Sequence, residues 1–287
     1  MVEDWIEARD GIRLHLREWP RQPATGTILI VHGLGEHSGR YEHVAAFLNG
    51  RGWRVVGYDH RGHGQSGGCR GRLAQGDDLL VDLAQVIEAV RVGITGPLVL
   101  LGHSLGGLVA ARFVAGGLEQ PRPAWHRAVE ALALSSPVLA SNMSFVQRAM
   151  LAVLEPLAPN LAVANGLVST GISRDPAVVA AYDADPLVHD RIAPRLARFV
   201  VDGGTAVLAL APAWTTPTLL LWAGSDRLVD ARGSAAFAAA APPAVVTAQV
   251  FPSLFHEIFN EPEQADVLSV LGAWLDKLQV SPTRISP

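Results

Sequence analysis

Short apolar runs alternate with longer stretches of helical spacing along most of the chain. Continuous apolar runs, typical of buried strands, occur at residues 27–31, 53–58, 97–101, 129–134, 218–222 and 245–251. Between them, apolar residues three and four apart predict helices at 41–49, 77–92, from about 105, at 231–241 and at 262–278. Because buried strands joined through helices form parallel sheets covered on both faces, this pattern predicts an α/β domain with a mainly parallel central sheet.

Two segments depart from this alternation. Residues 5–19 alternate around Asp10-Gly11, a pair that favours a two-residue turn, so we expect an N-terminal antiparallel hairpin. From 136 to 206 the chain has helical pieces, prolines and loop residues but no convincing strand. We therefore predict a core formed by residues 1–135 and 207–280, a helical cap insertion at 136–206 and a frayed tail at 281–287.

Composition narrows the class of protein. The 287 residues suit one domain with an insertion, and 49% hydrophobic with 17% charged residues fits a globular chain. The net charge of −4, with no basic stripe, argues against nucleic acid as a partner. A lone cysteine, Cys69, allows no internal disulfide, and the acidic start at Met1–Trp5 lacks a signal-peptide pattern, so we expect a cytoplasmic protein. Residues 203–225 carry no charge, but Pro212 and Pro217 interrupt them, so we expect no membrane span there.

The sharpest motif has the sequence GHSLG at residues 102–106. It follows the strand predicted at 97–101 and precedes a predicted helix, which is the context of the G-x-S-x-G elbow. A serine on this turn projects its hydroxyl from the carboxyl edge of the sheet, where the N-terminal amides of the next helix also point. We therefore predict that Ser104 is a nucleophile. The alternative, a turn in a dinucleotide-binding unit, lacks the G-x-G-x-x-G spacing at residues 31–36.

A nucleophilic serine needs a base, and the base needs an acid that orients it. In this fold the chain order is serine, acid, histidine, each after a successive strand. Asp226 follows the strand predicted at 218–222, and His256 follows the strand predicted at 245–251. Asp230 is the rival acid, but it lies at the start of a predicted helix, where a carboxylate has an ordinary capping role.

The tetrahedral intermediate also needs hydrogen-bond donors. We predict the backbone amide of Leu105, just after the nucleophile, and that of Leu34, in the turn after the first core strand. No histidine or carboxylate pattern has metal-ligand spacing, so we expect neither a metal nor another cofactor. We expect His60, His63 and His103 to be structural, and His15, His126 and His189 to be surface or cap residues.

Several longer stretches carry a family resemblance. Residues 31–68 read VHGLGEHSGRYEHVAAFLNGRGWRVVGYDHRGHGQSGG, and residues 173–189 read SRDPAVVAAYDADPLVH. Together with GHSLGG at 102–107, AGSDRLVD at 223–230 and FHEIFNE at 255–261, they resemble the monoacylglycerol lipase and lysophospholipase branch of the α/β hydrolases. The resemblance implies an α/β-hydrolase fold. It also implies a triad of Ser104, Asp226 and His256, with oxyanion donors at Leu34 and Leu105.

The same resemblance suggests a substrate. It implies a serine esterase that converts monoacylglycerol to glycerol and fatty acid through an acyl-enzyme on Ser104. Glu36 and Arg40 lie in the family's E-H-S-x-R-Y stretch, where they either recognise a polar headgroup or form a structural ion pair. Apolar residues of the predicted cap, among them Leu139, Met143 and Phe145, suit an acyl chain in the pocket or contact with a membrane or micelle.

Other activities stay open at this stage. A lysophospholipase or a general carboxylesterase would use the same residues on a lipid or a small ester. An acyltransferase or a peptidase would share the fold, whereas dehalogenases and epoxide hydrolases of this fold place an aspartate where Ser104 stands. A binding protein without catalysis would keep the pocket, but it would not need all three triad residues.

Overall fold

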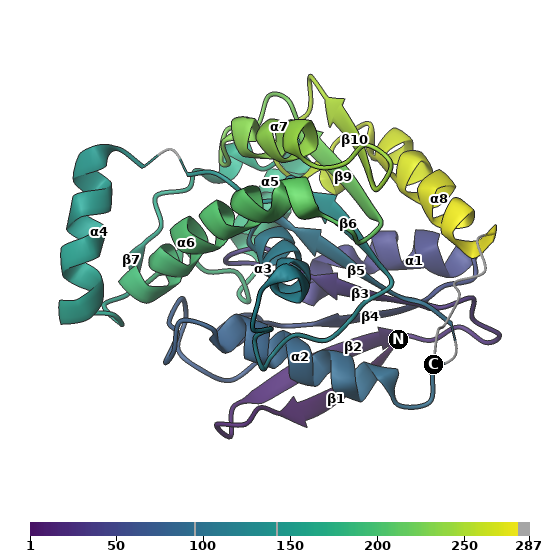
Figure 1. Cartoon of the computed structure of the whole chain (residues 1–287), viewed down its shortest axis with the longest axis horizontal. Coiled ribbons are helices and arrows are strands. Elements are labelled where there is room, and N and C mark those ends of the chain that lie inside the picture. Colours follow the sequence, from purple (N-terminus) through teal and green to yellow (C-terminus); the bar gives the residue numbers. More distant parts are fainter. Residues whose placement is uncertain (95, 142, 281–287) are drawn as a thin grey trace.

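An eight-stranded sheet forms the centre of the computed structural model, which describes residues 1–94, 96–141 and 143–280 (Figure 1). The strand order is β1-β2-β4-β3-β5-β6-β9-β10. β2 pairs antiparallel with β1 and β4, and every neighbouring pair from β4 to β10 is parallel. The strands are β1 (Val2–Glu7), β2 (Arg13–Trp19), β3 (Thr27–Val31), β4 (Arg54–Tyr58), β5 (Leu98–His103), β6 (Ala131–Ser135), β9 (Thr218–Ala223) and β10 (Val246–Phe251). The mainly parallel sheet predicted from the sequence is thereby confirmed.

Helices cover both faces of this sheet. Alternate residues of a strand enter opposite cores, because successive side chains in a strand point to opposite faces: Leu29 joins one core and Ile30 the other. The Ile30 core includes residues of α1 (Glu42–Gly50) and α8 (Gln264–Val280). The Leu29 core includes residues of α2 (Asp78–Arg91), α3 (Ser104–Ala115), α6 (Pro194–Leu210) and α7 (Ala231–Ala240). Short 3-10 turns are η1 (Ser38–Tyr41), η2 (Gly116–Leu118) and η5 (Ile258–Asn260).

The N-terminal hairpin forms, with a longer turn than expected. The last ladder pair joins Glu7 to Arg13, and the amide of Ala8 donates to the carbonyl of Ile12 at 2.7 Å. The turn therefore spans residues 8–12. Gly11 adopts a φ of +82°, so the glycine still supplies the left-handed residue that the turn needs.

The chain between β6 and β9, residues 136–217, forms an insertion. It contains α4 (Phe145–Leu157), β7 (Val163–Ala164), η3 (Ser169–Gly171), α5 (Pro176–Ala184), β8 (Arg191–Ile192), α6 and η4 (Ala211–Ala213). The antiparallel pair β7–β8 was not predicted, because two residues are too few to show a period of two. α6 runs through the boundary predicted at residue 206, and it packs against α3. The division into core and cap stays a prediction, and the predicted tail at 281–287 lies outside the described residues.

Within the part of the chain that the structure describes, one helical stretch, Pro194–Ala213, is long and apolar enough to cross a membrane. Its apolar side has another use, since Leu196, Phe199 and Val207 of α6 are buried in the core. A helix with one buried apolar face is the ordinary surface helix of a globular protein. Residues 203–225 form the end of α6, then η4 and β9.

Candidate active site

Ser104 lies on a strained turn between β5 and α3. Its φ of +53° falls in the left-handed region, which residues other than glycine rarely adopt. Glycine flanks it because the backbones meet there. A Cβ on Gly102 would lie 2.6 Å from the carbonyl oxygen of Gly106, and a Cβ on Gly106 would overlap the carbonyl oxygens of Val31 and His32. The GHSLG sequence therefore packs β5, α3 and the end of β3 closely around one serine.

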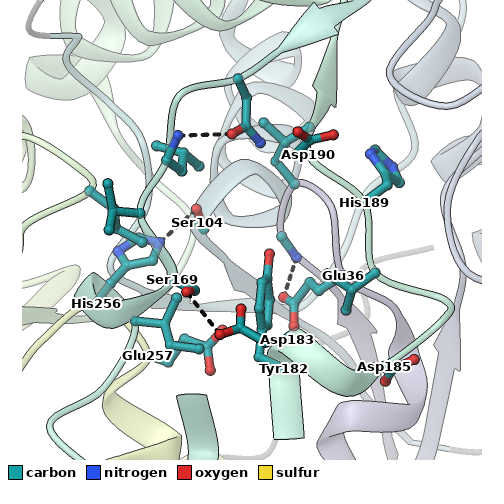
Figure 2. A pocket seen from close by; sticks show the side chains of 18 of the residues that line it. Glu36, Ser104, Ser169, Tyr182, Asp183, Asp185, His189, Asp190, His256 and Glu257 are labelled. Carbon is teal, nitrogen blue, oxygen red and sulfur yellow. Dashed lines mark hydrogen bonds between the residues drawn. The ribbon is translucent and has the colours of Figure 1, made fainter. Parts of the chain in front are cut away.

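Three side chains from distant segments meet at this turn, and Figure 2 shows two of them, Ser104 and His256. The Nε2 atom of His256 lies 2.8 Å from the Oγ atom of Ser104, and its Nδ1 atom lies 2.7 Å from Oδ2 of Asp226. The other carboxylate oxygen of Asp226 accepts the amides of Leu228 and Val229, both at 2.9 Å. The structure thus brings the predicted serine, histidine and aspartate into one hydrogen-bonded line.

Electrostatics keep this line in the state that base catalysis requires. Burial alone would raise the pKa of Asp226. The charge of His256, its hydrogen bond and the two backbone amides together have a larger effect in the opposite direction, so the pKa lies below its ordinary value. The carboxylate is therefore ionised and can hold the Nδ1 proton of His256. A second imidazole, that of His103, lies with its ring centroid 4.8 Å from that of His256. Burial, followed by the neighbouring His256, lowers the pKa of His103 to about 4, so its ring adds no positive charge at neutral pH.

The turn after β3 reaches the same serine. A Cβ on Gly33 would lie 3.2 Å from the Cβ of Ser104, and Leu34 lines the adjoining pocket. Leu105 is the second residue of α3, and the first amides of a helix have no partner within the helix. The residues predicted to donate to the oxyanion, Leu34 and Leu105, are therefore next to Ser104 on two sides. Their role as donors stays a prediction.

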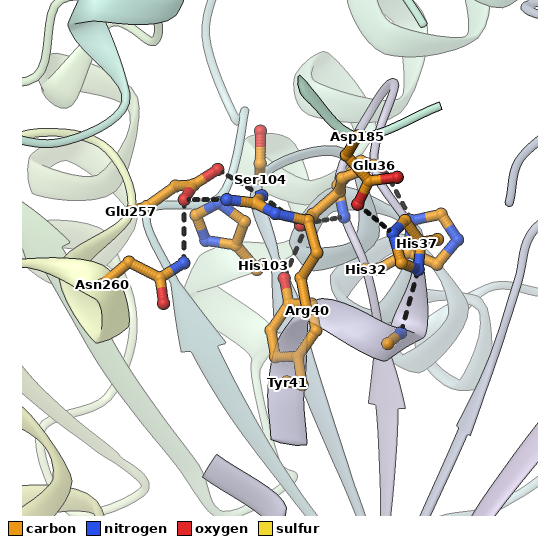
Figure 3. Close-up of polar contacts among 12 residues, drawn as sticks. His32, Glu36, His37, Arg40, Tyr41, His103, Ser104, Asp185, Glu257 and Asn260 are labelled. Atoms are coloured by element: carbon orange, nitrogen blue, oxygen red, sulfur yellow. Dashed lines mark hydrogen bonds and ion pairs between the residues drawn. The ribbon is translucent and has the colours of Figure 1, made fainter. Parts of the chain in front are cut away.

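Glu36 and Arg40 form part of a buried polar network (Figure 3). Glu36 accepts the amide of Gly33 at 2.6 Å, the hydroxyl of Tyr41 at 2.7 Å and Nη1 of Arg40 at 2.8 Å. Arg40 also donates to both oxygens of Glu257, at 2.6 and 2.8 Å. With these donors and acceptors engaged, the geometry favours the structural ion pair over headgroup recognition. Glu257 was not predicted as a site residue, although it directly follows His256 in the sequence.

A pocket of about 390 Å³ opens in front of Ser104. One part of its lining is apolar and consists of Leu34, Leu167, Val168, Ile172, Val188 and Leu228. The other part is polar and consists of Glu36, Asn165, Ser169, Tyr182, Asp183, Asp185, His189, Asp190 and Glu257 (Figure 2). Most of both sets comes from the insertion. Such a pocket can hold an acyl chain on one side and a hydroxylated group on the other.

Some residues lie elsewhere than the sequence indicated. Leu139 does not line the pocket: it is buried in the core, with its backbone against Gly204 of α6. Met143 is half-buried and is not part of the lining, and the side chain of Phe145 lies outside what the structure describes. His15, expected at the surface, is fully buried. His189 belongs to the insertion, as expected, but it lines the pocket and its amide donates to the carbonyl of Gly35 at 2.9 Å.

No group of three or more His, Cys, Asp or Glu residues within 1–94, 96–141 and 143–280 is arranged to hold a metal ion. The polar residues of the site instead serve one another and the backbone. The chemistry that this geometry supports is transfer of an acyl group to a serine hydroxyl, assisted by an imidazole and main-chain amides.

A parallel sheet that carries this serine at the end of a central strand defines the class of the serine α/β hydrolases. Within that class, a family model described as "Hydrolase_4: Serine aminopeptidase, S33" matches residues 22–263, and the chain belongs to this family.

Its similarities extend over nearly the whole chain. It is 37% identical over 277 residues to the monoacylglycerol lipase of Mycolicibacterium smegmatis, covering 92% of this chain and 93% of that protein. It is 32% identical to the human monoglyceride lipase, covering 97% and 91%. The crystal structure of Paleococcus ferrophilus monoacylglycerol lipase matches with a TM-score of 0.82 at 32% identity, covering 92% and 99%.

These similarities confirm the α/β-hydrolase fold and the family resemblance that the sequence indicated. They also show that the chain is a carboxylic ester hydrolase, a serine hydrolase similar to monoacylglycerol lipases.

Proposed function

We propose that this protein hydrolyses monoacylglycerols to glycerol and a fatty acid. The observation that carries the proposal is the hydrogen-bonded line of Ser104, His256 and Asp226, which opens into a pocket with an apolar and a polar part. Two relatives that cover more than nine-tenths of the chain, at 37% and 32% identity, are named for the same activity. An acyl chain fits the apolar lining, and the glycerol hydroxyls find acceptors on the polar side.

The geometry supports a two-step reaction through an acyl-enzyme. Oγ of Ser104 attacks the ester carbonyl carbon while Nε2 of His256 accepts the hydroxyl proton. The amides of Leu34 and Leu105 hold the negative oxygen of the tetrahedral intermediate. The bond from carbon to the glycerol oxygen then breaks, and Nε2 returns the proton to that oxygen. Water then attacks the acyl carbonyl carbon while Nε2 accepts a proton from it. The bond to Oγ of Ser104 breaks, the fatty acid leaves, and Nε2 returns the proton to Oγ, while Asp226 holds Nδ1 throughout.

A fluorophosphonate probe and a substrate panel test this proposal together. The wild type should be labelled, Ser104→Ala should not, and Ser169→Ala should be, because Ser169 lines the same pocket but hydrogen bonds to Asp183. Labelling that survives in Ser104→Ala would show that Ser104 is not the nucleophile. Turnover of monoacylglycerols should exceed that of triacylglycerols, lysophospholipids and peptide amides. A preference for lysophospholipids or for short soluble esters would reassign the protein to a lysophospholipase or a general carboxylesterase.

We further propose that the insertion contacts a lipid surface. The apolar residues Val146, Met150, Val153 and Leu157 of α4 are between 55 and 77% exposed. Their spacing of four, three and four residues places them on one face of the helix. α4 stands apart from the sheet, at the left in Figure 1. An exposed apolar stripe of this kind is typical of an interaction with a membrane or another apolar surface.

The exposed apolar surface continues toward the pocket. Leu161 and Val163 follow α4 and are exposed, and the exposed residues Leu167 and Val168 also line the pocket. A lipid drawn from a membrane or micelle would therefore meet apolar side chains along its way to Ser104. The location predicted from the sequence, cytoplasmic with peripheral membrane contact, stays a prediction.

Sedimentation with phosphatidylcholine vesicles tests the contact. Replacing Val153 and Leu157 by serine should weaken vesicle binding at least about tenfold, because burying one such side chain contributes about 1.5–3 kcal/mol. Turnover of a water-soluble ester should not change. Val92→Ser is the matched control, since Val92 is exposed at the end of α2. Equal vesicle binding by the double variant and the control would rule out docking through α4.

A further inference from the structure

Two loops surround Ser104, and each carries a buried carboxylate that hydrogen bonds to Arg40. The oxyanion loop, residues 32–41, follows β3 and carries Glu36; the histidine loop, residues 252–261, follows β10 and carries Glu257. Strands β3 and β10 are not neighbours in the sheet, since β5, β6 and β9 lie between them. Backbone pairing therefore does not join the two loops directly, and their spacing needs another connection.

Arg40 supplies that connection (Figure 3). Its Nη1 atom lies 2.8 Å from Oε2 of Glu36 and 2.6 Å from Oε1 of Glu257, and its Nη2 atom lies 2.8 Å from Oε2 of Glu257. All three side chains are buried: Arg40 is 11% exposed, Glu36 5% and Glu257 6%. Arg40 does not line the pocket, so it acts on the two loops and not on a substrate.

Both carboxylates are fixed to the parts of the loops that do the chemistry. Oε1 of Glu36 accepts the amide of Gly33, the residue before the predicted donor Leu34. Glu257 is covalently next to His256, and its amide donates to the carbonyl of Ile172 at 2.8 Å. A movement of the guanidinium would therefore be passed to the oxyanion donor on one side and to the base on the other.

We propose that Arg40 is a positioning residue, with Glu257 as its partner, that sets the distance between the oxyanion hole and the imidazole of His256. The inference rests on the proposed function. A guanidinium is suited to the task because its planar fork engages one carboxylate with two hydrogen bonds while it keeps donors for a second, which an ammonium cannot do with the same geometry. The ring of Tyr182, from the insertion, lies 4.8 Å from the guanidinium carbon of Arg40.

Steady-state kinetics of Arg40→Lys and Glu257→Gln provide the first test. We expect kcat to fall on the order of 10²-fold with little change in KM, because displacement of catalytic groups by about 1 Å has an effect of this size. Glu18→Gln is the matched control. It removes a carboxylate that receives two hydrogen bonds from Arg54, both at 2.8 Å, on strands outside the pocket. Its kcat should equal that of the wild type.

A double-mutant cycle separates positioning from general loss of packing. If Arg40 couples the two loops, Glu36→Gln combined with Glu257→Gln should lose much less kcat than the product of the single losses, because either change already frees the guanidinium. If the two substitutions acted independently, the fold losses in kcat of the single variants would multiply in the double variant. Melting temperatures of all variants identify any that fail to fold, and the conservative glutamine substitutions keep the volume of the side chains.

The pH profile supplies a readout that packing alone would not move. Arg40→Gln leaves Glu36 and Glu257 without their cation, which favours the protonated imidazole of His256, so activity should begin to fall at a higher pH than in the wild type. Glu257→Gln removes a negative charge and should move that fall to a lower pH. Asp226 and His103 contact this imidazole, and neither changes in the two variants. The other titratable residues that line the pocket, also unchanged, are Glu36, Tyr182, Asp183, Asp185, His189 and Asp190.

The outcomes distinguish the two proposals. Unchanged kcat in Arg40→Lys and Glu257→Gln, or equal pH profiles in Arg40→Gln and Glu257→Gln, would overturn the positioning role while fluorophosphonate labelling of Ser104 persists. Loss of the proposed function would show itself differently, as a wild type that the probe does not label or that prefers lysophospholipids or short soluble esters to monoacylglycerols.

Discussion

The Nδ1 atom of His32 lies 2.8 Å from the carbonyl oxygen of Gly33. The other ring nitrogen, Nε2, accepts the amide of His60 at 2.9 Å, so the ring proton is on Nδ1 and is donated to Gly33. In a trans peptide the carbonyl of Gly33 and the amide of Leu34 point in opposite directions. His32 therefore fixes the direction of the amide that we predict to bind the oxyanion.

Replacing His32 tests this relationship. His32→Phe removes both hydrogen bonds while keeping a ring, and we expect kcat to fall by up to about 10²–10³, the effect of losing one oxyanion donor. The unpaired amide of His60 should also lower the free energy of unfolding by about 1–3 kcal/mol. The control is His126→Phe, because Nδ1 of His126 lies 3.1 Å from a carbonyl, that of Phe113, away from the pocket. A folded His32→Phe enzyme with unchanged kcat would contradict the role.

The amide bonds to Asp226 make Asp226→Asn a specific probe of the histidine tautomer. The amides of Leu228 and Val229 need an acceptor, so the asparagine would direct its oxygen to them and its NH₂ group to Nδ1 of His256. Nδ1 would then have to accept a hydrogen bond, so the ring proton would move to Nε2. With Nε2 protonated, the imidazole could not accept the proton of Ser104.

We expect kcat of Asp226→Asn to fall about 10⁴-fold, the size of effect known for the wrong tautomer in a serine triad, with little change in KM. Asp230→Asn serves as the control, since Asp230 caps α7 and accepts a hydrogen bond from the backbone amide of Arg232. A loss of less than tenfold would show that Asp226 does not orient His256.

Gly106 should not tolerate a side chain. A Cβ there would overlap the carbonyl oxygens of Val31 and His32, which belong to backbone that cannot rotate away. Gly106→Ala should lower the free energy of unfolding by about 1–3 kcal/mol or more, measured by urea denaturation. Gly50→Ala is the matched control, because a Cβ on Gly50 at the end of α1 would meet nothing within 4 Å. Equal stability of the two variants would contradict the close packing at the elbow.

The core strands and the triad line could be predicted because their signals are local. Apolar runs placed β3 at residues 27–31, where the structure has it, and the GHSLG motif identified the turn at Ser104. The order of strands along the chain was enough to find Asp226 and His256. In each case a few adjacent residues determine both the element and the side chain that ends it.

The pocket could not be predicted in the same way. Its lining depends on how the insertion folds back, which brings His189 onto Gly35 across a long stretch of chain. An apolar residue such as Leu139 has the same sequence signal in a core as in a pocket. Glu257 was hidden because its partner Arg40 is 217 residues away, and a pair at this distance leaves no local pattern.

Several buried imidazoles should make the protein sensitive to mild acid: besides His32 and His103, burial lowers the pKa of His189 to about 4 and that of His60 and His63 well below 6.5. Burial lowers the pKa of His32 and of His103 from 6.5 to about 4. Between these values the unfolded chain binds more protons than the folded chain, so stability falls as the pH decreases. A decrease of about 2.5 in pKa corresponds to about 3 kcal/mol for each group, present in full above pH 6.5 and lost toward pH 4.

Urea denaturation between pH 7 and 4.5 measures this loss. The lowered pKa values of Asp226 and Glu36 affect stability mainly below their ordinary values of 3.8 and 4.5, so the chosen window reports on the imidazoles. We expect the free energy of unfolding to drop steadily across it in the wild type. The drop should be smaller in His32→Phe, because one of these groups no longer titrates. A free energy that stays constant from pH 6.5 to 4.5 would show that these rings are not held neutral by the fold.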